Sequence, residues 1–147
     1  MLVAMTTASS ARHILLAEDN PADVFLVREA LRRQEIECEI RVIADGEEAI
    51  SFIDGLDADL KSPALDLLLL DLHLPKRDGE AVLNHLRASE RSGQTPVIVL
   101  TSSESQTERQ NVERHADVHY FRKPSSLNEF MELGEIVVNA MNNSGPS

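Results

Sequence analysis

Carboxylates stand at the ends of two apolar stretches of the sequence. Glu18 and Asp19 close the run HILLAED, and Asp71 follows four consecutive leucines. A charge at the end of a buried strand is tolerated only if it is paired, hydrated or held for chemistry. Two unit charges about 4 Å apart repel by about 4 kcal/mol at an effective dielectric of 20. If the two strands are neighbours, these acids require a cation, and hard oxygen ligands favour Mg²⁺ or Mn²⁺ over zinc.

Two later strands end in residues that suit the same chemistry. Thr101 closes TPVIVLT, and Lys123 precedes a proline at the end of VHYFRK. A carboxylate can attack phosphorus and become an aspartyl phosphate, while a metal ion and a lysine neutralise the phosphoryl oxygens. Each residue alone also fits a structural role, such as a helix cap or a solvated strand end. Their combination favours a phosphoryl-accepting site.

The elements that must position these residues alternate along the chain. Apolar runs predict strands, and helical spacing of apolar residues predicts helices between them. This alternation implies an α/β fold, a doubly wound (βα)5 parallel five-stranded sheet, whose ligands bind beyond the carboxyl ends of the strands. The predicted strands are 13–19, 38–43, 65–70, 95–101 and 118–123, and the predicted helices are 20–34, 46–56, 78–90, 103–116 and 125–141.

Composition excludes several classes of function. The chain has 147 residues, which suits a single domain, and its 25 acidic residues against 14 basic give a net charge of −11. This charge repels nucleic acid and anionic lipid, so neither is expected as a partner. A single cysteine, no run of the roughly 20 apolar residues that span a membrane, and no secretory signal predict a cytoplasmic protein. The segments 1–11 and 143–147 are expected to be disordered.

The order and spacing of four stretches resemble the receiver domains of two-component response regulators, the CheY-like family. The stretches are ILLAEDN, LLLLDLHLPKRDG, VIVLTSS and YFRKP, and the resemblance covers residues 12–142. It implies a flavodoxin-like strand order, 2-1-3-4-5. It also implies a single-domain regulator that accepts a phosphoryl group from a sensor histidine kinase. Such a protein signals by conformational change and protein contact, and catalyses only its own phosphorylation and dephosphorylation.

The resemblance assigns a role to each matching residue. Asp71 is implied to be the phosphoacceptor, and Mg²⁺ would be held by Glu18, Asp19, Asp71 and the backbone carbonyl of His73. The ring of His73 is expected to point towards the phosphoryl group. The phosphoryl-binding residues are implied to be Thr101 and Lys123, and the switch residues Thr101 and Tyr120.

Further features distinguish this chain from other receiver domains. The stretch IDGLDADLKSPALD, residues 53–66, is longer than in chemotaxis-type receivers and resembles the small regulators associated with phytochromes. A phytochrome-type kinase is therefore a candidate partner. Ala116 stands where many receivers carry glycine, so the turn before the last strand is expected to differ. Surplus apolar residues on helix 125–141 suggest a homodimer through this helix, strand 118–123 and helix 103–116.

An enzyme remains the alternative. A Mg²⁺-dependent phosphatase of the haloacid-dehalogenase type also uses an aspartate nucleophile. Such enzymes carry a second aspartate two residues further on as the acid and base, and this position is His73 here.

Overall fold

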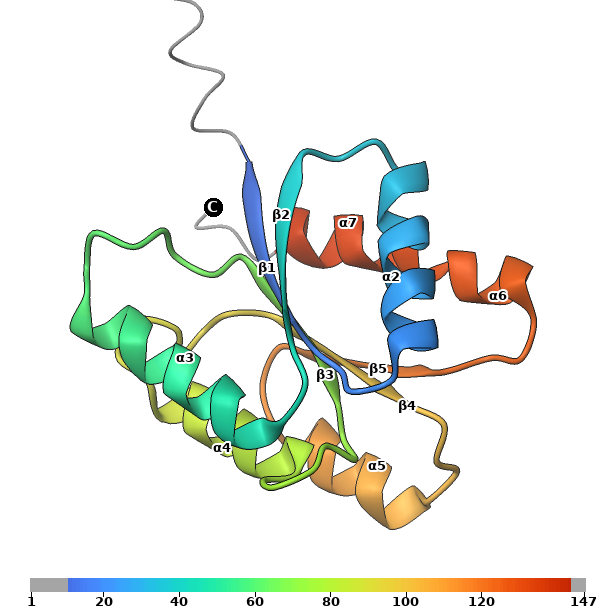
Figure 1. The fold of residues 1–147 in the computed structure, drawn as a ribbon. Helices are drawn as coiled ribbons and strands as arrows, with labels where there is room; N and C mark the ends of the chain where they lie inside the picture. The colour runs from blue at the N-terminus through green and yellow to red at the C-terminus, as the bar shows by residue number, and fades with distance from the viewer. Residues whose placement is uncertain (1–10, 144–147) are drawn as a thin grey trace, which may run out of the picture.

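Five parallel strands form one sheet in the order β2-β1-β3-β4-β5, which confirms the predicted flavodoxin-like topology (Figure 1). The computed structural model describes residues 11–143, so the ends predicted to be disordered lie outside the described residues apart from positions 11 and 143. The strands are β1 (Arg12–Ala17), β2 (Cys38–Ile43), β3 (Leu67–Asp71), β4 (Val97–Thr101) and β5 (Val118–Arg122). The helices are α2 (Pro21–Arg33), α3 (Gly46–Ala58), α4 (Gly79–Ala88), α5 (Gln106–Glu113), α6 (Leu127–Met131) and α7 (Leu133–Asn143).

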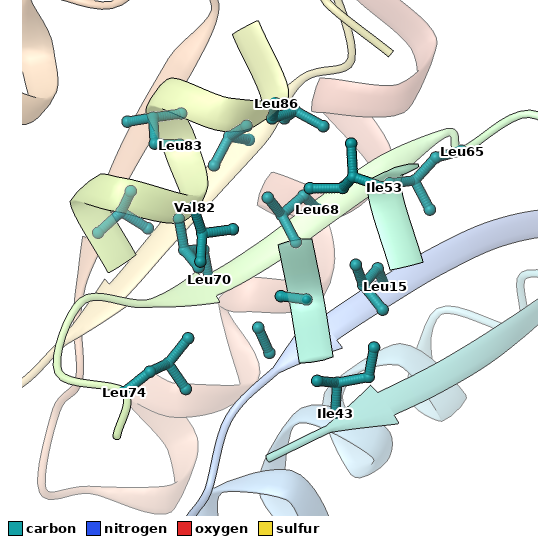
Figure 2. Close-up of a cluster of buried hydrophobic side chains, with 14 of the residues drawn as sticks. Leu15, Ile43, Ile53, Leu65, Leu68, Leu70, Leu74, Val82, Leu83 and Leu86 are labelled. Carbon is teal, nitrogen blue, oxygen red and sulfur yellow. The ribbon is translucent and has the colours of Figure 1, made fainter. Parts of the chain in front are cut away.

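Helices cover both faces of the sheet, and alternate residues of each central strand face opposite sides. Leu68 and Leu70 of β3 pack against α3, α4 and α5, whereas Leu67 and Leu69 pack against α2, α6 and α7 (Figure 1). The first of these two clusters is drawn in Figure 2, where side chains of β1, β2, β3, α3 and α4 meet. All five residues of β3 are buried, which explains why the sequence there is a continuous apolar run rather than an alternating one.

Five helices begin with a side chain that caps a free backbone N–H group. The side chain of Asp45, for example, accepts a hydrogen bond of 2.8 Å from the amide of Glu48 at the start of α3. Such caps satisfy amides that have no partner inside the helix. They therefore order the loops that follow the carboxyl ends of the strands. The capping residues are Asn20, Asp45, Asp78, Ser105 and Ser126.

Two glycines allow loops on this edge of the sheet to pack tightly. A Cβ atom on Gly79 would lie 2.6 Å from the carbonyl oxygen of Asp71, and one on Gly46 would lie 1.8 Å from that of Arg77. The amide of Gly79 also donates to the carbonyl of Leu72 at 2.8 Å. The DG pair before α4 therefore lets the chain fold back directly beneath the end of β3.

The long segment between α3 and β3 is attached to the end of α4. The side chain of Asp57 accepts hydrogen bonds from the Ser89 hydroxyl, at 2.8 Å, and from the Arg91 amide, at 3.1 Å. The Arg91 guanidinium donates to the carbonyls of Leu56 and Asp59, at 3.0 Å each, and to that of Ser62. These hydrogen bonds, which are partly buried, hold the extra residues of the segment against the end of α4.

One detail departs from the sequence-based expectations, and a second agrees with the expected effect of Ala116 on the turn before β5. The closing helix predicted over 125–141 is divided at Glu132, where the amide bonds back to Glu129 and tightens the last turn of α6. Just beyond, a Cβ atom on Gly134 would lie 2.6 Å from the carbonyl of Ala30, so α7 packs closely on α2. The turn before β5 takes its left-handed residue at Asp117, with φ of 58°, rather than at Ala116. Aspartate tolerates this conformation better than alanine does.

No helix within residues 11–143 has the length and apolar character that crossing a bilayer requires.

Candidate functional site

Three carboxylates converge where β1 and β3 end, as the sequence predicts. The strands are hydrogen-bonded neighbours with Ala17 level with Leu70, so Glu18 and Asp71 follow at the same height. One oxygen from each of Glu18, Asp19 and Asp71 lies within 4.8 Å of the others. Glu18 and Asp71 are buried, and Asp19 is exposed. The parallel register therefore produces the acidic cluster.

Burial makes Glu18 an unusual acid. Removal from water raises its pKa from an ordinary value of 4.5 to about 7, and the nearby charge of Asp71 adds to the rise. A hydrogen bond from Lys123 opposes both effects. The carboxylate also accepts a hydrogen bond of 3.2 Å from the amide of Asn20. The ionised form of Glu18 is thus costly in the absence of further positive charge, as a cation site requires.

Lys123, just after β5, supplies the one cation that contacts this cluster among the described residues. Its Nζ atom lies 2.9 Å from Oε1 of Glu18, 2.8 Å from Oδ2 of Asp23 and 3.8 Å from Oδ2 of Asp71. Burial alone would lower the pKa of Lys123, but the hydrogen bonds with Asp23 and Glu18 outweigh it and raise the pKa. The lysine is therefore charged and hydrogen-bonded to two acids, with Asp71 just beyond hydrogen-bonding distance.

The turn after β3 orients Asp71. Its Oδ1 atom accepts a hydrogen bond of 3.0 Å from the amide of His73. The structure gives the ring of His73 another neighbour than the expected phosphoryl group: its Nε2 atom lies 3.3 Å from Oε1 of Glu108 in α5. The side chain of His73 is therefore engaged with α5.

The two predicted switch residues meet at one loop residue. Thr101 is fully buried, and its Oγ1 atom accepts a hydrogen bond of 3.0 Å from the amide of Ser103. The hydroxyl of Tyr120 donates to the carbonyl of Ser103 at 3.5 Å, and the guanidinium of Arg109 lies 4.9 Å from the centre of the tyrosine ring. The amide of Lys123 donates to the carbonyl of Thr101 at 2.8 Å. The end of β4 and the loop after it therefore contact both Lys123 and Tyr120.

Sequence reasoning missed Asp23, whose carboxylate is as close to Lys123 as that of Glu18. It lies in the first turn of α2, where acids are common because they interact favourably with the helix dipole. One signal in the sequence could have identified Asp23. It stands four residues after Asp19, in the helix that begins just after Glu18 and Asp19. Nothing in the sequence shows which way that turn faces.

The donor set fits a hard divalent cation. Three carboxylate oxygens within 4.8 Å of one another form the single such group among residues 11–143, and they offer oxygen ligands only. With Lys123 at 3.8 Å from Asp71 and the buried Thr101 at the end of the neighbouring strand β4, the arrangement has the groups that phosphoryl transfer to a carboxylate requires. The carboxylate supplies the nucleophile, and the cations balance the charge that accumulates.

Fold and site together define a parallel α/β domain with an acidic cation site at the carboxyl edge of its sheet. The model of the response regulator receiver domain family matches residues 14–134, and the chain belongs to this family. It is a receiver-domain response regulator of two-component systems. Receiver domains partner with sensor histidine kinases, bind Mg²⁺ or Mn²⁺ at an acidic site, and generally act as phosphoacceptors rather than as enzymes that turn over substrate. This membership leaves the phosphatase alternative without support.

The most similar proteins include regulators associated with phytochromes. Response regulator Rcp1 of Synechocystis is 35% identical over 121 residues, which cover 82% of this chain and 82% of that protein. The phosphorylated cyanobacterial phytochrome response regulator RcpA superposes with a TM-score of 0.80 at 27% identity, over 92% of this chain and 97% of that one. The Mn²⁺-bound form of Rcp1 gives a TM-score of 0.76 at 32% identity, over 86% and 91%.

Proposed function

We propose that Asp71 is the residue that accepts the phosphoryl group. The observation that carries this proposal is the surroundings of its carboxylate. One oxygen is held by the His73 amide at 3.0 Å, and the other faces the Lys123 ammonium at 3.8 Å. Oxygens of Glu18 and Asp19 lie within 4.8 Å of it. The carboxylate of Asp71 is therefore oriented and buried. It lies beside an ammonium group and beside acids that could bind a metal ion, and both cations would offset negative charge.

The same residues would hold the metal ion. Glu18, Asp19, Asp71 and the backbone carbonyl of His73 form the proposed ligand set for Mg²⁺, with Mn²⁺ as the alternative ion. When bound, the ion would offset the negative charge of the carboxylates and of the phosphoryl oxygens. The raised pKa of Glu18 supports this assignment, because an acid that is costly to ionise becomes favourable beside a cation.

The transfer uses side chains that surround Asp71, two of which shift to meet the phosphoryl group. A carboxylate oxygen of Asp71 forms a bond to the phosphorus of a phosphohistidine on the kinase, while the bond from phosphorus to the histidine nitrogen breaks and that nitrogen retains the electron pair. Lys123 pairs with the phosphoryl group, and Thr101 donates its hydroxyl to it. A hydroxyl can donate and accept at the same time, so the bond from the Ser103 amide is lost only if the side chain turns to reach the phosphoryl group, and we propose that it turns.

This exchange connects the site to a distant surface. When Thr101 turns towards the phosphoryl group, the loop that carries Ser103 follows it. Tyr120 is hydrogen-bonded to the carbonyl of Ser103, so its hydroxyl loses or changes its partner. The face formed by α5, β5, α6 and α7 then rearranges. A local charge thereby biases a two-state element.

The proposed partners follow from this surface and from the relatives. A phytochrome-type sensor histidine kinase is the proposed donor, because the regulators Rcp1 and RcpA resemble this chain. The α5, β5, α6 and α7 face is the proposed homodimer surface, with Leu127 half-exposed on it. Residues 12–142 are the proposed receiver domain, and the net charge of −11 argues against direct binding to nucleic acid or anionic membrane.

Incubation with acetyl phosphate and Mg²⁺, followed by intact mass measurement, tests the phosphoacceptor. The wild type is expected to gain the mass of one phosphoryl group, and Asp71→Asn is expected to gain none. Asp54→Asn is a matched control, because Asp54 lies on α3 with 62% of its side chain exposed and should retain full modification. Modification of Asp71→Asn to the wild-type extent would contradict the assignment.

Size-exclusion chromatography under the same conditions tests the dimer. Phosphorylated wild type is expected to elute earlier than the unphosphorylated protein, and Asp71→Asn is expected to elute unchanged. Identical elution of phosphorylated and unphosphorylated wild type would contradict dimerisation controlled by phosphorylation.

A further inference from the structure

Lys123 is held by an acid that lies outside the metal-ligand cluster. Its Nζ atom lies 2.8 Å from Oδ2 of Asp23 and 2.9 Å from Oε1 of Glu18. The distance to Oδ2 of Asp71 is 3.8 Å, beyond hydrogen-bonding range. Of these three acids, Glu18 and Asp71 belong to the cluster of candidate metal ligands, and Asp23 does not.

The contact with Asp23 is sheltered, and the backbone that carries Asp23 is restrained. The side chain of Lys123 is 12% exposed and that of Asp23 is 18% exposed. Asp23 sits in the first turn of α2, where Asn20 caps the helix and Pro21 occupies its first position. Such a start restricts the backbone that carries Asp23. The carboxylate therefore has little freedom to follow the lysine elsewhere.

We propose that Asp23 is a positioning residue that holds the ammonium group of Lys123 away from Asp71 until a phosphoryl group is present. The proposal rests on the function proposed above for Asp71 and Lys123. A lysine has three N–H donors, and the two short contacts fix the direction of the group towards Glu18 and Asp23. A phosphoryl group on Asp71 must draw the ammonium across, and Asp23 opposes this movement. Asp23 thus sets how firmly the site retains a phosphoryl group.

The hydrogen bond from Lys123 to Asp23, called the tether below, affects metal binding in the opposite direction. Without Asp23, the ammonium group is free to approach the carboxylate of Asp71. There it competes with a cation for the same oxygens. Loss of Asp23 is therefore expected to weaken Mg²⁺ binding and to strengthen binding of a phosphoryl group. General damage to the fold would weaken both, so the two measurements together distinguish the tether from a structural role.

Beryllofluoride, a mimic of the phosphoryl group, is the probe for the first measurement. Its affinity is measured at saturating Mg²⁺, and Mg²⁺ affinity is measured separately by calorimetry. Asp23→Asn and Asp23→Ser are both expected to bind beryllofluoride roughly three- to tenfold more tightly, the range that the net loss of one competing hydrogen bond supports. Both are expected to bind Mg²⁺ about threefold more weakly. Asp23→Glu, which keeps the charge and the acceptor, should restore wild-type behaviour.

Two controls distinguish loss of the tether from the long-range electrostatic effect of removing one negative charge. Glu29→Gln removes one charge from the same helix, but Glu29 pairs with Arg32 and Arg33 and not with Lys123, so both affinities should remain within twofold of wild type. A field effect would shrink between about 0.05 M and about 0.5 M KCl, whereas a sheltered hydrogen bond would keep the ratio of variant to wild type.

The possible failures are distinct. If the wild type binds no beryllofluoride in the presence of Mg²⁺, the proposed phosphoacceptor function is wrong. If the wild type binds it and the Asp23 variants bind it equally well, more weakly, or only with a ratio that vanishes in salt, the function stands and the tether is refuted.

Discussion

Replacement of Glu18 by glutamine is expected to stabilise the metal-free protein at neutral and alkaline pH. Glu18 is 1% exposed, and its burial raises the pKa from 4.5 to about 7. The folded protein therefore retains a proton that the unfolded chain releases between these values. The free energy of unfolding then falls as the pH rises through this window, and the full cost is reached above the folded pKa.

The magnitude follows from the same two values. At about 1.4 kcal/mol for each pH unit, a rise from 4.5 to about 7 corresponds to roughly 3 kcal/mol of stability lost to the ionised carboxylate. Glutamine resembles the protonated acid and has no charge to bury. Glu18→Gln should therefore gain roughly 3 kcal/mol near pH 8 and under about 1 kcal/mol near pH 5, where the wild type is itself largely protonated.

Urea denaturation in EDTA across this pH range is the assay, with circular dichroism as the readout. Asp19→Asn is the matched control, because it removes one carboxylate of the same cluster from an exposed position and should change stability by less than roughly 0.5 kcal/mol. Saturating Mg²⁺ should raise the stability of the wild type more than that of Glu18→Gln, since only the former keeps the full ligand set. A gain that is independent of pH, or a loss near pH 8, would refute the reasoning.

Three other predictions concern a glycine beneath β3, an arginine that binds backbone carbonyls near β4, and the tyrosine of β5. Gly79→Ala should lower the free energy of unfolding by roughly 1–3 kcal/mol through its clash with the backbone of Asp71, whereas Gly55→Ala, with open space inside α3, should be neutral or gain up to about 1 kcal/mol in the same urea titration. Arg87→Met should lower the free energy of unfolding by roughly 2–3 kcal/mol in thermal and urea denaturation, because the Arg87 guanidinium donates to four backbone carbonyls around β4 and the turn before β5. A decrease below about 0.5 kcal/mol would contradict that role. Tyr120 is the single tyrosine of a chain without tryptophan, so beryllofluoride with Mg²⁺ should change the intrinsic fluorescence of the wild type but not that of Thr101→Ala, and an equal change in both would argue against the link through the loop.

The arrangement of strands and acids could be predicted because it depends on short-range regularities. A fully apolar run such as Leu67–Leu70 is stable only when both faces are covered, which favours a central parallel strand. Polar residues that follow such strands must then gather at one edge of the sheet, because all the strands point the same way. The convergence of Glu18, Asp19 and Asp71 within 4.8 Å is a consequence of this geometry.

The partners of individual side chains could not be predicted in the same way. Lys123 was expected to bind the phosphoryl group, and the sequence did not show that its ammonium group also contacts Glu18 and Asp23. The ring of His73 was expected near the phosphoryl group, and it lies against Glu108 of α5. In both cases one partner, Asp23 or Glu108, belongs to a helix packed against the sheet. Its rotation and distance depend on the packing of the whole face rather than on any local pattern.

Periodicity and composition alone therefore determined the α/β class, the edge of the sheet that carries the chemistry, and the residues available there. Tertiary packing decided the break at Glu132, the left-handed conformation at Asp117 and the acids that hold the lysine. The physical reason is the range of the interactions. A strand or a capped helix is specified by neighbours in sequence, whereas a buried ion pair between residues 100 positions apart, such as Lys123 and Asp23, exists only once the sheet and its helices have closed around it.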